Sequence, residues 1–366
     1  MRAAVMYGRE DVRIEDAARP EPQEGELLLA VETVGICGTD ASEYHRGPAM
    51  FPIEVKNEIT GHVGPMIPGH EFSGLVVAAG EGVDGFESGD LVASGAGISC
   101  GECSRCKKGQ TNLCIRYNSV GLERNGALAE YVTAPASACL NLSGRGMTAD
   151  LAALAQPMSI AIHAMRRGSL APGNEALIIG TGGIGTFLTL AASSERADLT
   201  VVDLQADRLE IASHLGADRT VLVDPDSSLI EALSGPGSFD VVYECTGVPQ
   251  PLQAALELVR PGGRVVAVGI PKGEISINVN RLVLQEKDLV GTLAHAFLSD
   301  FPAAIDLLQG SAALMKRVAP DVLPLETLVT EGIEPIVEGR QTRIKTLFSP
   351  TLDEPRAIDV QFQTGA

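Results

Sequence analysis

The chain has 366 residues, of which 45% are hydrophobic and 20% are charged, so it can bury the cores of two or three domains. Asp and Glu number 47 against 28 Lys and Arg, and the formal net charge of −19 argues against a nucleic-acid or anionic-membrane partner. No uncharged apolar run reaches the length of a membrane span, and the N-terminus lacks the apolar core of a signal peptide. We therefore expect a cytoplasmic protein without a transmembrane helix.

The first 155 residues are rich in Gly and Pro and contain short apolar runs, such as Glu26–Glu32 and Ser73–Val77. Turn signals separate these runs, a pattern typical of a barrel-like β domain. The chain returns to mixed loops from about residue 297. In this last part we expect a helix near Phe301–Leu308, a closing strand near Ile344–Phe348 and a loosely held polar tail from Asp353.

Residues 156–296 alternate between apolar strands, Gly-rich turns and helical stretches. Such alternation predicts a parallel, doubly wound sheet. The predicted strands are Ala176–Gly180, Leu199–Asp203, Thr220–Val223, Asp240–Cys245, Arg264–Gly269 and Asp288–Gly291, and the predicted helices between them include Ala206–Leu215 and Pro251–Val259.

A glycine-rich turn follows the first of these strands. The run Gly180-Thr181-Gly182-Gly183-Ile184-Gly185 has the spacing G-x-G-x-x-G and opens an apolar helix over Phe187–Ala192. In that spacing the glycines permit a tight turn, let backbone N–H groups reach a pyrophosphate and pack the helix on the strand. We therefore predict a dinucleotide site; the alternative is a glycine-rich turn without a ligand.

The second predicted strand ends in Asp203, eighteen positions after Gly185. A carboxylate there accepts hydrogen bonds from ribose hydroxyls and repels a 2′-phosphate, so we favour NAD over NADP, although Arg208 nearby keeps NADP open. Two loops at strand ends, Cys245–Gly247 and Val268–Ile270, either flank the nicotinamide or are plain turns. The predicted cofactor-binding residues are Gly180, Gly182, Gly183, Ile184, Gly185, Asp203, Arg208, Thr246, Val268 and Gly269.

Four cysteines lie within fifteen residues, with the spacing C-x2-C-x2-C-x7-C: Cys100, Cys103, Cys106 and Cys114. Four thiolates satisfy tetrahedral zinc with every coordination position filled, so we predict a structural zinc site. The alternatives are disulfides, idle thiols or an iron–sulfur cluster, and the x7 gap disfavours the cluster.

A second set of metal-binding residue types is dispersed. Cys37 lies in Gly35-Ile36-Cys37-Gly38-Thr39-Asp40, and His70-Glu71 follows Gly69. A thiolate, an imidazole and a carboxylate make a catalytic type of zinc site when a fourth position stays open. Taken singly, Cys37 could be a small buried hydrophobe, His70 a hydrogen-bonded histidine and Glu71 a surface charge.

Together these motifs resemble those of the zinc-dependent medium-chain alcohol dehydrogenases, in the polyol branch of sorbitol, butanediol and threonine dehydrogenases. Further matching segments are Gly89–Val92, Gly126–Tyr131 and Gln156–Ala164, and the resemblance covers about residues 1–350. It implies a GroES-like, β-barrel-type catalytic domain over 1–155 and 297–366, with the structural zinc lobe at 96–116. The Rossmann domain, a doubly wound parallel sheet, is then expected over 156–296.

The resemblance also implies a catalytic zinc bound by Cys37, His70 and Glu71, in addition to the structural zinc. Relatives carry Glu where this chain has Gln156, and that Glu touches the zinc directly or through water. Gln156 keeps an acceptor oxygen but removes a negative charge, so it leaves the fourth ligand open.

Three further positions concern the proton that the alcohol loses. Thr39 matches the hydroxyl residue that begins proton release. Many relatives carry His where this chain has Ser42, and Ser can pass a proton but cannot store one near neutral pH. His45 lies close enough to substitute or is a surface histidine. The predicted catalytic residues are thus Thr39, Ser42 and Glu71.

The resemblance implies reversible oxidation of a secondary alcohol, within a polyol or vicinal diol, to a ketone, with hydride transfer to NAD. A small-molecule alcohol is thus the expected substrate, and this branch commonly forms homotetramers where the related branch forms dimers. Two alternatives stay open. One is an NADPH-dependent aldehyde or ketone reductase, and the other is a non-catalytic relative that binds NAD(H), which the departures at Gln156 and Ser42 favour.

Overall fold

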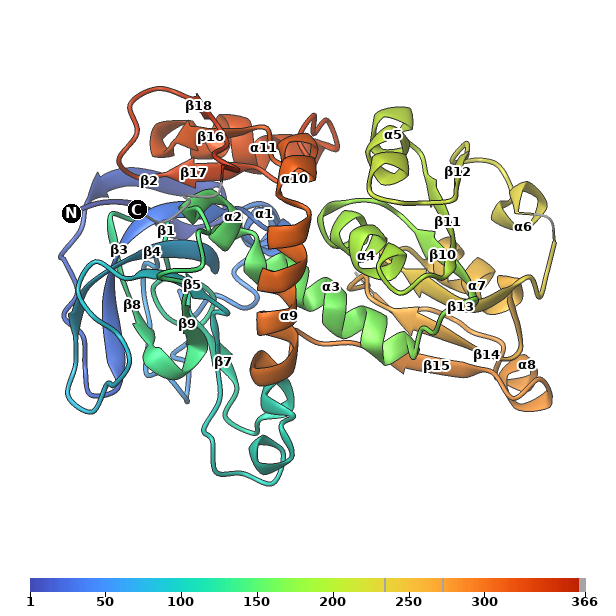
Figure 1. Ribbon diagram of the computed structural model, residues 1–366, viewed down its shortest axis with the longest axis horizontal. Helices are drawn as coiled ribbons and strands as arrows, with labels where there is room; N and C mark the ends of the chain where they lie inside the picture. The colour runs from blue at the N-terminus through green and yellow to red at the C-terminus, as the bar shows by residue number, and fades with distance from the viewer. Residues whose placement is uncertain (234, 272, 362–366) are drawn as a thin grey trace. The chain divides into compact units, whose positions relative to one another are not determined.

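The computed structural model describes residues 1–233, 235–271 and 273–361. The chain divides into two compact units (Figure 1). The first consists of Met1–Ser159 and His295–Ala366, and the second consists of Ile160–Ala294. These limits lie within four residues of the domain limits expected above.

An eight-stranded sheet organises the first unit. Its central strand β3 (Glu26–Gly35) pairs with β4 (Glu71–Ala79), β8 (Tyr131–Pro135) and β17 (Leu347–Ser349), so an early and a late segment of the chain meet in one sheet (Figure 1). The strand order is β18-β16-β17-β3-β4-β5-β9, with β5 (Leu91–Ser94), β9 (Cys139–Asn141), β16 (Asp321–Pro324) and β18 (Arg356–Ala357). The unit also contains two separate two-stranded sheets. One pairs β1 (Arg2–Gly8) with β2 (Asp11–Asp16), and the other pairs β6 (Gly97–Ile98) with β7 (Asn118–Ser119).

Apolar side chains of β3 and β4 form the centre of the hydrophobic core of this unit. Leu27, Leu29 and Phe72 are fully buried and pack with Phe348 of β17. Alternating strand residues reach this core because successive side chains of a strand point to opposite faces. The unit is the expected GroES-like β domain. Its helices are α1 (Gly38–Arg46), α2 (Ala149–Ala153), α9 (Phe297–Gly310), α10 (Ala312–Val318) and α11 (Glu334–Glu338).

The polar tail is held more firmly than the sequence suggested. Asp150 is buried at the start of α2, and both its oxygens accept hydrogen bonds from the guanidinium of Arg356, at 2.6 and 2.9 Å. The backbone N–H of Asp359 also donates to Asp150, at 2.7 Å, and Ile358 is 4% exposed. The expectation of a loose tail is therefore wrong up to residue 361, and residues 362–366 lie outside the described part of the chain.

The second unit contains a six-stranded, wholly parallel sheet in the order β12-β11-β10-β13-β14-β15, the predicted Rossmann architecture. Its strands are β10 (Glu175–Ile179), β11 (Asp198–Asp203), β12 (Arg219–Leu222), β13 (Phe239–Glu244), β14 (Val259–Ala267) and β15 (Asp288–Gly291). The helices are α4 (Gly183–Ser193), α5 (Ala206–His214), α6 (Leu229–Ala232), α7 (Pro249–Leu258) and α8 (Val279–Leu284), while α3 (Ala155–Gly168) begins in the first unit. Strand β14 starts five residues earlier than predicted because Val259 already pairs with Phe239.

None of the described helices combines the length and the apolar character that a bilayer crossing requires.

Candidate active site and metal centres

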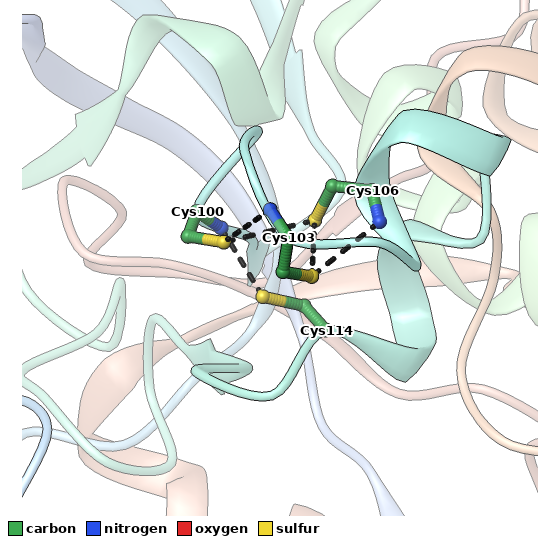
Figure 2. Close-up of side chains that lie close together, drawn as sticks. All are labelled: Cys100, Cys103, Cys106 and Cys114. Carbon is green, nitrogen blue, oxygen red and sulfur yellow. Dashed lines mark hydrogen bonds between the residues drawn. The ribbon is translucent and has the colours of Figure 1, made fainter.

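The four clustered cysteines converge on one point. Cys100, Cys103, Cys106 and Cys114 place their sulfur atoms within 4.8 Å of one another, and Figure 2 shows the four side chains pointing inward. The Sγ of Cys106 lies 3.5 Å from that of Cys103 and 4.0 Å from that of Cys100. A zinc ion with Zn–S bonds of about 2.3 Å requires sulfur atoms about 3.8 Å apart. The cluster therefore fits a tetrahedral four-thiolate site.

Backbone N–H groups point at these sulfur atoms. Cys106 N donates to Cys103 Sγ at 3.5 Å, and Arg116 N donates to Cys114 Sγ at 3.3 Å. Backbone hydrogen bonds lower the pKa of Cys103 to about 6, whereas burial raises the pKa of Cys106 to about 11. All seven cysteines are free thiols, so the disulfide alternative is wrong.

The dispersed residues also come together. Gly35, the last residue of β3, pairs with Glu71, the first residue of β4, so the loop after β3 lies beside the residue before β4. Cys37, His70 and Glu71 thus place their potential ligand atoms within 4.8 Å of one another. Both His70 and Glu71 are buried. This arrangement needs glycine at position 35, since a Cβ there would lie 2.6 Å from Glu71 Oε2.

Asp40 stands behind this cluster. Its Oδ2 accepts a hydrogen bond from Cys37 N at 2.9 Å, and its Oδ1 lies 3.8 Å from His70 Nδ1. With Nδ1 directed at Asp40, the Nε2 of His70 is left for a metal. Burial lowers the pKa of His70, but Asp40 and Cys37 outweigh it and raise that pKa to about 9. Sequence reasoning missed Asp40, although its place at the start of a helix next to Cys37 was a usable signal.

Lys345 is a second residue that the sequence analysis missed. Its Nζ donates to both oxygens of Glu71, at 2.7 and 2.6 Å, and to the carbonyl of Ile36 at 3.0 Å. Burial lowers the pKa of Lys345, but the nearby charges of Glu71 and Cys37 raise it overall. No local sequence pattern predicts a role for Lys345, because 274 positions separate it from Glu71.

Gln156 is the fourth candidate ligand, and it lies in the first turn of α3. Its side chain is 6% exposed, and its Oε1 has no hydrogen-bond partner among the described residues. A buried carbonyl oxygen without a hydrogen-bond partner lowers the stability of the folded protein. Binding a cation or a water molecule would remove this cost. Cys37, His70 and Glu71 supply a thiolate, an imidazole and a carboxylate that fit a zinc ion, and the Gln156 oxygen stays the predicted fourth ligand.

The predicted proton-relay residues occupy one side of α1. Thr39 is half-buried, and its Oγ1 accepts a weak hydrogen bond from Cys37 Sγ at 3.8 Å. Ser42, one turn further along, is exposed. His45 makes a contact of 3.4 Å between its Nδ1 and Glu10. Thr39 thus lies next to Cys37, a potential metal ligand, while Ser42 is exposed to solvent.

Half of the predicted cofactor residues border a cavity of about 830 Å³ in the second unit. The cavity lies at the carboxyl ends of β10, β11 and β13, which is where parallel sheets bind ligands. Five of the ten predicted residues line it: Gly180, Gly182, Asp203, Arg208 and Thr246. Gly183, Ile184, Gly185, Val268 and Gly269 are not part of this lining; Gly183 begins α4 and Ile184 lies in its first turn.

Two of those remaining glycines pack the strand ends together. A Cβ on Gly185 would lie 1.9 Å from the carbonyl oxygen of Gly180, and a Cβ on Gly269 would lie 2.0 Å from Gly247 N. Glu244 fixes the loop that follows β13, since its carboxylate accepts hydrogen bonds from Thr246 N and Gly247 N. These contacts hold the loops rigid at the edge of the cavity.

Asp203 is buried and already engaged within the protein. Its Oδ2 accepts hydrogen bonds from Thr181 N at 2.7 Å and Thr181 Oγ1 at 2.8 Å, and its Oδ1 accepts one from Gln205 N at 3.0 Å. A carboxylate has about four acceptor positions. Among the described residues, these hydrogen bonds thus leave one acceptor position of Oδ1 unused.

A two-unit chain with a four-thiolate site, a thiolate–imidazole–carboxylate site and a Rossmann sheet defines a zinc-binding, dinucleotide-linked dehydrogenase. Comparison with known proteins agrees. Residues 23–144 match the alcohol dehydrogenase GroES-like domain, and residues 183–310 match the zinc-binding dehydrogenase domain.

Relatives match along nearly the whole chain. Sorbitol dehydrogenase of Bacillus subtilis (strain 168) is 32% identical over 96% of this chain and 97% of its own. The crystal structure of 2R,3R-butanediol dehydrogenase from Bacillus subtilis is 28% identical with a TM-score of 0.86, covering 95% and 99% of the two chains. A zinc-binding dehydrogenase structure from Sinorhizobium meliloti 1021 bound to NADP is 27% identical with a TM-score of 0.83, covering 95% and 99%. The chain belongs to the zinc-dependent medium-chain alcohol dehydrogenase family, in its polyol branch, and the resemblance predicted from the sequence is confirmed.

Proposed function

We propose that the protein reversibly oxidises a secondary alcohol within a polyol or vicinal diol to a ketone, with NAD as the hydride acceptor. The observation that carries this proposal is the convergence of Cys37, His70 and Glu71 within 4.8 Å, in a chain whose relatives include sorbitol and butanediol dehydrogenases. A site with thiolate, imidazole and oxygen donors supports Lewis-acid chemistry on a hydroxyl group.

Cys37 and His70 are the residues that would hold the catalytic zinc, with Glu71 and Gln156 as the oxygen donors. Zinc bound there would supply Lewis-acid activation of the alcohol. Asp40 orients His70 by facing its Nδ1. Thr39 Oγ1, beside Cys37 Sγ, takes the hydroxyl proton of the substrate, and Ser42 passes it to solvent.

The second zinc has a structural role, because the four cysteines of the lobe fill every coordination position. A four-thiolate site requires reduced cysteines, which supports a cytoplasmic location. We thus expect two zinc ions per chain.

Asp203 supports NAD as the cofactor. Its remaining acceptor position suits a ribose hydroxyl, and its negative charge opposes a 2′-phosphate. Arg208 lines the same cavity and is the feature that would favour NADP. Cofactor preference therefore separates the dehydrogenase from the NADPH-dependent reductase.

We also infer a homo-oligomer. Strand β15 ends the six-stranded sheet, so one of its edges has no strand partner among the described residues. The same unit also exposes apolar side chains, with Val283 at 68%, Leu284 at 75% and Ile270 at 81%. Free edges and exposed apolar groups favour association between copies of a chain. Light scattering of the purified protein tests this, and a monomer would contradict it.

The function is tested by metal analysis together with a substrate screen. Wild-type protein should contain two zinc ions and reduce NAD with one or more members of a panel of diols, sugar alcohols, inositols and simple secondary alcohols. C37S should lose one zinc and its activity, whereas the matched control C139S, at a buried cysteine outside both clusters, should keep both. One zinc per chain and no turnover on any alcohol would instead support a non-catalytic NAD(H)-binding protein.

A further inference from the structure

The ion pair between Lys345 and Glu71 is the feature of the metal site that its proposed function leaves unexplained. Both side chains are almost fully buried, at 4% and 1% exposure. An ammonium group has three N–H donors, and here they go to Glu71 Oε1, Glu71 Oε2 and the carbonyl of Ile36. All three donors of Lys345 are therefore bonded, two of them to the carboxylate of a candidate zinc ligand and one to the backbone that follows β3.

The fold fixes this pair from three directions. Lys345 N donates to Val318 O at 2.9 Å, and the strand that follows, β17, pairs with the end of β3. Glu71 starts β4 and pairs with Gly35, whose missing side chain leaves room for the carboxylate. The backbone of each partner is thus held in place and both side chains are buried, so the pair is a built part of the site.

A metal ion and Lys345 compete for the same carboxylate. A ligand atom of Glu71 lies within 4.8 Å of those of Cys37 and His70, so it is within reach of a metal that these two residues bind. Bonding by a buried ammonium withdraws charge from the carboxylate oxygens, which makes Glu71 a weaker metal ligand. Gln156 offers an amide oxygen, which carries no negative charge.

We propose that Lys345 is a positioning residue of the metal site, which keeps Glu71 ion-paired and so holds it back from full ligation. The metal is then left with one uncompensated anionic ligand, the thiolate of Cys37. A metal with fewer anionic ligands is a stronger Lewis acid and is held less tightly. This inference rests on the proposed catalytic zinc.

The test compares K345M with wild type in protein loaded with Co²⁺, whose visible absorption reports the ligands and the coordination number. We expect the metal in K345M to gain a carboxylate ligand, which changes the spectrum. We also expect a chelator to remove the metal of this site at least about tenfold more slowly than in wild type. The pH profile of kcat should move upward, because an added anionic ligand weakens the Lewis acid.

Three variants isolate the effect. K345R keeps the charge and should resemble wild type. The double variant E71Q/K345M removes the carboxylate and should lose the gain in metal retention. K287M is the matched control, since Lys287 is also buried, at 8% exposure, but donates to the backbone carbonyl of Leu256 in the second unit, whereas both candidate metal sites belong to the first. It should leave the spectrum and the release rate unchanged.

Metal release from K345M as fast as from wild type, or slow release that persists in E71Q/K345M, would overturn the proposal. If metal-free K345M folds poorly, its melting temperature with and without Co²⁺ serves instead, and the gain on metal binding should exceed that of wild type. Wild-type protein that binds only one metal per chain would refute the catalytic zinc itself. Two metals in wild type and an unaltered K345M would refute only the role of Lys345.

Discussion

Replacing Asp203 by Asn tests the cofactor site at its most informative residue. The carboxylate accepts three hydrogen bonds within the protein, two from Thr181 and one from Gln205. An amide can keep the two bonds from Thr181 with its oxygen, but its NH₂ group then faces Gln205 N and the position left for the ribose. The substitution therefore removes one internal acceptor, the acceptor for the cofactor and the negative charge.

The magnitudes follow from these contacts. A hydrogen bond to a charged group contributes about 1.5–3 kcal/mol, so NAD should bind about 10- to 100-fold more weakly. A carboxylate and a phosphate charge about 4 Å apart repel by about 1 kcal/mol in water and about 4 kcal/mol near a protein surface. The lost hydrogen bond to NAD and the removed repulsion of NADP together should shift the ratio of kcat/KM for NAD to that for NADP by at least about tenfold toward NADP.

Steady-state kinetics with both cofactors measures this ratio, and chemical denaturation measures the structural cost. The control is T181V, which removes one internal hydrogen bond to Asp203 but leaves its charge. T181V should lower the free energy of unfolding by about 1 kcal/mol and leave the cofactor ratio unchanged. An unaltered ratio in D203N, or an equal shift in T181V, would show that Asp203 serves only the fold.

Three further predictions concern the metals and the tail. C103S should lose the zinc of the four-cysteine lobe and yield poorly soluble protein; stable, fully active protein with a single zinc would contradict a structural role. D150A should lower the free energy of unfolding by about 3 kcal/mol, because it breaks the ion pair with Arg356 and leaves the buried Thr33 hydroxyl and the Asp359 N–H without their acceptor. D306A, at an exposed ion pair, should cost less than about 1 kcal/mol, and equal losses in denaturant titrations would refute this. Because the pKa of His70 is raised to about 9 in the metal-free protein, zinc must displace its proton in addition to the thiol proton of Cys37, so zinc affinity by competition titration should rise by at least about tenfold per pH unit between pH 7 and 8; a flat profile would contradict this.

Local sequence determined much of this protein. The six parallel strands follow from apolar runs separated by glycine turns and helical stretches, and the four-cysteine site follows from ligands within fifteen residues. The glycine-rich turn was likewise readable, because its steric demands apply to neighbours such as Gly180 and Gly185. In each case the interacting groups are close in the chain, so their spacing carries the information.

Only the tertiary structure decided what surrounds the dispersed site. Lys345 reaches Glu71 because β17, near the C-terminus, pairs with β3, and no local pattern encodes that pairing. The anchoring of the tail by Asp150 is of the same kind, since 206 positions separate it from Arg356. A lone Lys or Asp is usually a solvated surface charge. It becomes part of a site only when strand pairing buries it against a partner. Which residues are buried in this way is decided by the tertiary structure.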